Sequence, residues 1–206
     1  MRTALASLLV VCIATGTLAW ATDGFRVLTS EQARRLAVSE RPVAVPDVGL
    51  RMDNGARQSL RDLLHDEGAR SIVGFFYSRC TSICITLGND FRQLQQRIVD
   101  EGLEGRVKLL SISFDTQADT AAVLRDYRER MRARDNIWQI AAAQDGQELA
   151  VLLESFGVTV IDDGRGGFVH NSAYHIVNAR GELEAIVDLA KPLAALRAAR
   201  GRRHEA

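Results

Sequence analysis

The stretch SIVGFFYSRCTSICITLG, residues 71–88, joins a strand pattern to a helix pattern. Its first half is a short apolar run rich in aromatic and branched residues, which predicts a buried strand that ends at Ser78 and Arg79. After Cys84, apolar residues return with helical spacing at Leu87, Phe91, Leu94 and Ile98. The two cysteines of the stretch are therefore expected where a central strand turns into a helix.

Cys80 and Cys84 have the i, i+4 spacing that places two side chains on one face of a helix. The first N–H groups of a helix lack partners and carry partial positive charge, which favours a thiolate over a thiol. The pair can be a structural disulfide, a redox dithiol or part of a soft-metal site. A disulfide across so short a loop restricts the unfolded chain little, which disfavours the structural disulfide. The other two interpretations need sulfurs that are exposed and ionisable.

The composition is that of an ordinary globular protein. The chain has 206 residues, of which 47% are hydrophobic and 25% charged, a length that suits one well-buried domain. Its 26 Lys and Arg residues balance 26 Asp and Glu residues. Because the net charge is zero, electrostatics give no reason to expect binding to nucleic acid or to an anionic membrane surface.

The N-terminus has a different character. No charged residue occurs from Thr3 through Ala21, and the stretch ends Ala-Trp-Ala, so residues 1–21 are expected to be a secretory signal peptide. An uncleaved N-terminal anchor is the alternative, and it would be the chain's one connection to a membrane. Residues 22–45 are expected to be a linker or tether, and residues 46–206 the folded domain. The protein is then exported, and is either periplasmic or tethered to the membrane outside the cytoplasm.

The rest of the chain alternates between strand and helix patterns. A helix begun by Ser30 as its cap and a hairpin over 48–60 come first. The strands that follow are expected at 71–77, 107–114, 137–142, 169–177 and 182–188, and the helices at 59–64, from Cys84 to near Gly102, at 119–134, 147–156 and from Lys191. This order predicts an α/β fold: a thioredoxin-like three-layer sandwich with a mixed central sheet, parallel in its first half, and an N-terminal hairpin extension.

His170 lies just ahead of the expected C-terminal hairpin, where thioredoxin-type oxidoreductases carry a cis-proline that faces the cysteines. The chain's three prolines are elsewhere, at positions 42, 46 and 192. An imidazole beside two thiolates gives a three-coordinate site that suits Cu(I) and offers three ligands to Cu(II), whereas zinc needs a fourth. His175 could supply it, but it is expected on the opposite face of a strand unless a bulge intervenes. A hydrogen-bonded surface histidine remains the alternative for His170.

Three separated motifs resemble the SCO (SenC-type) family: FFYSRCTSIC at 75–84, SISFDTQADT at 111–120 and VHNS at 169–172. Members of that family are membrane-anchored or exported thioredoxin-fold proteins that bind copper and help assemble the copper centre of cytochrome c oxidase. The resemblance implies that Cys80, Cys84 and His170 are copper ligands. It also implies that the chain is a copper chaperone whose partners are an apo-cuproprotein, such as an oxidase subunit, and a protein that reduces its thiols.

The chain departs from the family at several positions beside the site. The family usually has proline after each cysteine, where this chain has Thr81 and Ile85, and an acidic residue where it has Ser82. Thr116 replaces a further proline after Asp115. These changes keep the ligands but remove backbone constraints that shape the loop.

Two enzyme functions compete with the chaperone. An extracytoplasmic thiol–disulfide reductase would use Cys80 and Cys84 without a metal, to keep a partner's cysteines reduced. A thiol peroxidase would need a low-pKa cysteine beside a hydroxyl and an arginine, which Ser78, Arg79 and Thr81 nearly provide. Both would be expected to work without copper.

Overall fold

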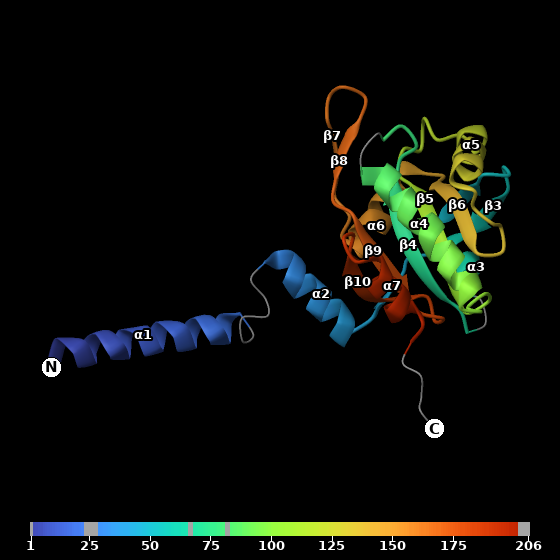
Figure 1. Cartoon of the computed structure of the whole chain (residues 1–206). Helices are drawn as coiled ribbons and strands as arrows, with labels where there is room; N and C mark the ends of the chain where they lie inside the picture. Colours follow the sequence, from blue (N-terminus) through green and yellow to red (C-terminus); the bar gives the residue numbers. More distant parts are fainter. Residues whose placement is uncertain (1, 23–28, 66–67, 81–82, 202–206) are drawn as a thin grey trace.

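The computed structural model describes residues 2–22, 29–65, 68–80 and 83–201 (Figure 1). Its helices are α1 (Arg2–Ala21), α2 (Ser30–Glu40), α3 (Leu60–Leu64), α4 (Ile83–Asp100), α5 (Ala121–Met131), α6 (Gly146–Phe156) and α7 (Pro192–Ala199). Its strands are β1 (Val43–Ala44), β2 (Gly49–Met52), β3 (Arg57–Ser59), β4 (Arg70–Phe76), β5 (Val107–Ser113), β6 (Trp138–Ala143), β7 (Val160–Asp162), β8 (Phe168–His170), β9 (Ala173–Val177) and β10 (Glu182–Asp188).

The main sheet is mixed, as the sequence predicts. Its strand order is β1-β10-β9-β4-β5-β6-β2-β3. Strands β4, β5 and β6 run parallel, whereas β9 pairs antiparallel with β4 and β10 antiparallel with β9. The predicted N-terminal hairpin is present as β2–β3 and extends the sheet beyond β6. The carboxyl end of β4, from which the cysteine loop leaves, therefore lies near the middle of the sheet.

Helices cover both faces of the sheet and make three layers (Figure 1). Successive side chains of β4 point to opposite faces, so Phe76 stacks on Tyr127 of α5 while Phe75 packs edge-on against Phe156 of α6. Gly74 lets α4 lie close to the sheet, because a Cβ at this position would be 3.1 Å from one side-chain carbon each of Leu87 and Phe91. The predicted sandwich is confirmed.

The structure corrects the predictions at two places. The cap of α2 is Thr29 rather than Ser30: the Thr29 side chain accepts from the Gln32 N–H, and the Gln32 side chain accepts from the Thr29 N–H. The strand expected over 169–177 is two strands, β8 and β9. Strand β8 leaves the main sheet and pairs with β7, a hairpin that was not predicted and that projects past the sheet in Figure 1.

The N-terminal segment contains three elements. Helix α2 packs against β10, and β1 pairs with the same strand at the edge of the sheet. Helix α1 carries exposed apolar side chains such as Leu9 and Trp20. Among the helices of the described residues, none combines the length and the apolar character needed to cross a membrane. Residues 23–28, which belong to the expected linker, lie outside the described part.

Candidate metal centre

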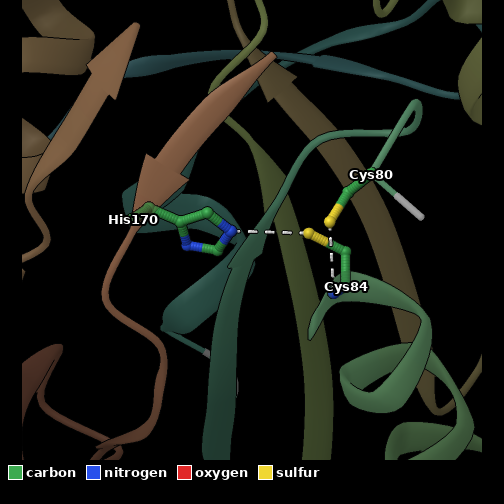
Figure 2. Close-up of side chains that lie close together, drawn as sticks. All are labelled: Cys80, Cys84 and His170. Atoms are coloured by element: carbon green, nitrogen blue, oxygen red, sulfur yellow. Dashed lines mark hydrogen bonds between the residues drawn. The ribbon is translucent and has the colours of Figure 1, made fainter. Parts of the chain in front are cut away.

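Cys80, Cys84 and His170, the three predicted ligands, lie together (Figure 2). Their two sulfurs and one ring nitrogen are all within 4.8 Å of one another. The Cys84 sulfur is 3.5 Å from Nε2 of His170, and the Cys84 backbone N–H points at the Cys80 sulfur at the same distance. Both cysteines are free thiols. The fold thus brings two soft donors and one borderline donor to one point.

The cysteines are placed by the turn that joins β4 to α4. The Cys80 N–H donates to the Tyr77 carbonyl at 3.2 Å, which closes a tight turn after the strand. Cys84 lies in the first turn of α4 and is 2% exposed, and Cys80 is 7% exposed. The positions of Thr81 and Ser82, where the chain departs from the family pattern, lie outside the described residues. Both cysteines are therefore buried, and their sulfurs lie beside the His170 ring.

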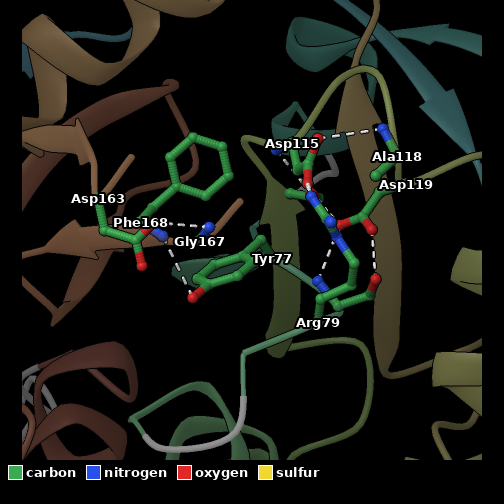
Figure 3. Close-up of polar contacts among 10 residues, drawn as sticks. Tyr77, Arg79, Asp115, Ala118, Asp119, Asp163, Gly167 and Phe168 are labelled. Carbon is green, nitrogen blue, oxygen red and sulfur yellow. Dashed lines mark hydrogen bonds and ion pairs between the residues drawn. The ribbon is translucent and has the colours of Figure 1, made fainter. Parts of the chain in front are cut away.

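An aromatic cluster holds the β7–β8 hairpin over the end of β4. The ring of Phe168 packs edge-on against Tyr77 and Phe114, with centroid distances of 5.2 and 5.5 Å. The Phe168 N–H also points at the Tyr77 hydroxyl, at 3.4 Å (Figure 3). The His170 ring lies edge-on to Phe114 at 5.0 Å. This packing fixes the distance between the histidine and the cysteines.

The other ring nitrogen of His170 is held from the protein side. Nδ1 lies 3.0 Å from the carbonyl oxygen of Asn171 and 3.2 Å from the hydroxyl of Ser172. A carbonyl oxygen only accepts, so Nδ1 carries the proton in that bond and Nε2 presents a lone pair toward Cys84. Burial lowers the pKa of His170, which also favours the neutral ring. A neutral imidazole with its far nitrogen anchored is the form that binds metals.

The thiols differ from the sequence expectation of exposed, ionised sulfurs. Burial raises the pKa of Cys84 well above its usual range, and the neighbouring Cys80 and Asp119 act in the same direction. The loss of hydration thus outweighs the advantage of a helix N-terminus for the thiolate. In the metal-free state Cys84 is a protonated thiol, and a metal ion must displace its proton in order to bind.

His175 does not join the group. It lies in β9, is 3% exposed, and packs edge-on between Phe75 and Phe156 at centroid distances of 5.7 and 5.2 Å. Burial lowers the pKa of His175 to about 3, so the ring is neutral. The expectation placed both histidines on one strand with His175 on its opposite face; the structure instead puts His170 in β8 and His175 in β9, which belong to different sheets. The cluster of the described residues has three candidate ligands.

Sequence reasoning missed the residues that support the site. Tyr77, Phe114 and Phe168 form the aromatic cluster, and Asp119 binds the loop that leads to Cys80. The ion pair between Arg79 and Asp115, 2.8 Å long, ties the same loop to the end of β5 (Figure 3). The aromatic residues at the ends of two predicted strands were the available signal, but the partner strand β8 was not predicted.

Comparison with solved structures shows which fold this is. The chain is similar to a putative electron transfer protein from Aquifex aeolicus, with a TM-score of 0.67 and 19% identity over 79% of this chain and 96% of that one. It is also similar to copper-bound ScoI from Bradyrhizobium japonicum, with a TM-score of 0.60 and 18% identity over 76% of this chain and 97% of that one. BsSco, a member of the Sco family of cytochrome c oxidase assembly proteins, matches with a TM-score of 0.59 and 18% identity over 75% of this chain and 94% of that one.

At these identities the comparisons establish the fold, which is the thioredoxin-like fold of the Sco proteins. No curated protein matches the chain. The family model described as SCO1/SenC matches residues 53–200, a stretch that includes both cysteines, His170 and the whole central sheet from β4 onward. The chain therefore belongs to the SCO1/SenC family.

Proposed function

We propose that this protein is a copper-binding chaperone that holds one copper ion through Cys80, Cys84 and His170. The observation that carries the proposal is the convergence of two sulfurs and an imidazole nitrogen within 4.8 Å. Two thiolates and one imidazole match the preferences of Cu(I), and they give Cu(II) three strong ligands. The copper-bound structure of a Sco protein with the same fold supports this choice of metal.

The site suits a carrier, since its ligands come from a rigid strand end and a separate hairpin. Cys80 and Cys84 follow β4, whereas His170 is the last residue of β8. A partner that offers its own ligands can then replace the imidazole first and the thiolates afterwards. We propose that the recipient is an apo-cuproprotein, a subunit of cytochrome c oxidase, and that a reductant protein keeps the thiols reduced. The protein acts after export, outside the cytoplasm.

The two competing enzyme functions fit the geometry less well. A thiol–disulfide reductase needs an attacking thiolate, but burial raises the pKa of Cys84. A thiol peroxidase needs a free hydroxyl and a free arginine beside its cysteine. Ser78 is bonded to Asp119, and Arg79 is paired with Asp115.

An anaerobic copper titration of the reduced full-length chain tests the proposal. We expect one equivalent of Cu(I) to bind, and one equivalent of Cu(II) to give a sulfur-to-copper charge-transfer band. Cys80→Ser and Cys84→Ser should each abolish the band, whereas Ser39→Ala, on the exposed side of α2, should leave it unchanged. Wild-type protein that binds neither ion would rule out the chaperone and leave the reductase as the better account.

A further inference from the structure

Asp119 is a fully buried carboxylate next to the loop that carries Cys80. It is 0% exposed and lies between β5 and α5. Its oxygens accept hydrogen bonds from the Ser78 N–H at 2.9 Å, from the Ser78 hydroxyl and from the Ser113 hydroxyl. The donors come from the carboxyl ends of β4 and β5. One side chain thus joins the two strand ends at the start of the loop that carries Cys80.

The backbone of Asp119 is fixed independently of these bonds. The Asp119 N–H donates to the Asp115 carbonyl at 3.0 Å, and Arg51 of β2 donates to the Asp119 carbonyl, also at 3.0 Å. The position of the carboxylate is therefore set by the Asp119 backbone, and its hydrogen bonds hold Ser78 in place. Ser78 is two residues before Cys80 and is the second residue of the turn from Tyr77 to Cys80 that places the first thiol. Holding Ser78 by both its N–H and its hydroxyl fixes where that turn starts.

The carboxylate also brings a negative charge that forms no ion pair among the described residues. Arg79, the arginine in the adjacent loop, pairs with Asp115 instead, and Arg51 bonds to the Asp119 backbone. The charge lies close to the thiol loop, since the Asp119 carboxylate is bonded to Ser78, two residues before Cys80. A charge in a low-dielectric interior acts strongly over such distances.

The sign of this effect on copper follows from counting charges. Two thiolates, a neutral imidazole and Cu(I) carry a net charge of minus one, whereas the same ligands with Cu(II) are neutral. A nearby carboxylate repels the first complex more than the second. Asp119 should therefore favour Cu(II) relative to Cu(I), in a site whose donor set alone accepts both ions.

We propose that Asp119 is a positioning residue of the copper site: it fixes the start of the thiol loop through Ser78, and its charge shifts the site's preference toward Cu(II). The proposal rests on the function proposed above, in which Cys80, Cys84 and His170 hold copper.

Asp119→Asn separates charge from position. An asparagine oxygen can accept from the Ser78 N–H and the Ser113 hydroxyl, and its amide can donate to the Ser78 hydroxyl, so all three bonds can persist. The measurement is the ratio of Cu(I) to Cu(II) affinity, obtained by competition titrations with a chelator for each ion and checked by redox potentiometry. We expect the ratio to rise about tenfold, equivalent to a reduction potential higher by about 59 mV. Asp126→Asn, an exposed carboxylate on α5, is the matched control and should leave the ratio unchanged.

Two further variants keep the proposal testable if Asp119→Asn does not fold. Ser78→Ala removes a positioning bond that is also a donor to the carboxylate, so both affinities should fall and their ratio should move about two- to threefold toward Cu(II). Ser113→Ala removes a donor that offsets the carboxylate's field, so the ratio should move about two- to threefold toward Cu(II). A wild-type ratio in Asp119→Asn, or in Ser113→Ala when the first variant does not fold, would overturn the proposal. Wild-type protein that binds neither ion would instead overturn the proposed function itself.

Discussion

Replacing His170 by alanine tests the candidate site most directly, because it removes the one ligand that comes from outside the cysteine loop. Nε2 of His170 lies 3.5 Å from the Cys84 sulfur, and the ring contacts Phe114 edge-on. The substitution leaves two thiolates. Linear coordination by two sulfurs satisfies Cu(I), whereas Cu(II) prefers further nitrogen or oxygen donors. The two oxidation states should therefore respond differently.

The expected magnitudes follow from these contacts. Loss of a residue that only orients a metal ligand lowers affinity about 10- to 100-fold, so loss of the ligand itself should lower Cu(II) affinity by about 100-fold or more. That corresponds to about 2.7 kcal/mol of binding free energy. Cu(I) affinity should fall by less than about tenfold. Loss of the edge-on contact with Phe114 should reduce the free energy of unfolding by only about 0.5–1.5 kcal/mol.

The assay is a pair of anaerobic competition titrations, with the charge-transfer band of the Cu(II) complex as a second readout. His65→Ala is the matched control, because His65 is exposed at the end of α3 and is not part of the ligand cluster. We expect His170→Ala to lose the band while its thiols still oxidise at a rate near that of the wild type. Unchanged Cu(II) binding would remove His170 from the site and refute the reasoning.

Three further predictions concern the thiols and the N-terminus. Closing a disulfide between Cys80 and Cys84 should prevent copper binding, since the disulfide and the copper complex use the same two sulfurs. Equal Cu(I) uptake by oxidised and reduced protein, measured by metal analysis after gel filtration, would contradict this. Burial raises the folded-state pKa of Cys84, so its contribution to the stability of the metal-free protein should be complete below the thiol pKa of the unfolded chain, about 8.5, and should be lost as pH rises above it. Urea unfolding between pH 7 and 9.5 should show the free energy of unfolding falling with pH in the wild type, and falling less in Cys84→Ala. The mature protein should begin at or near Thr22, which intact mass spectrometry decides; a mass that retains Arg2 would indicate an uncleaved anchor.

Much of the fold could be predicted because its signals are local. The apolar run before Cys80 and the helical spacing after Cys84 each depend on residues within a few turns, and both elements occur as predicted. The order of strands and helices then leaves few topologies, since crossover connections between parallel strands need a helix between them. The hairpin β7–β8 escaped prediction because its strands have three residues each and flank a glycine-rich turn, which gives too short a pattern to recognise.

The sequence by itself determined the strand–turn–helix that carries the cysteines, the thioredoxin-like order of elements and the three candidate ligands. Only the tertiary structure decided that His170 meets Cys84, a contact between residues 86 positions apart. That contact depends on the aromatic packing of Phe168, and a sequence pattern does not specify which distant side chains fill the same space. The protonation of Cys84 was likewise decided by the tertiary structure, since a pKa follows from the burial and charges that surround a group rather than from its neighbours in the chain.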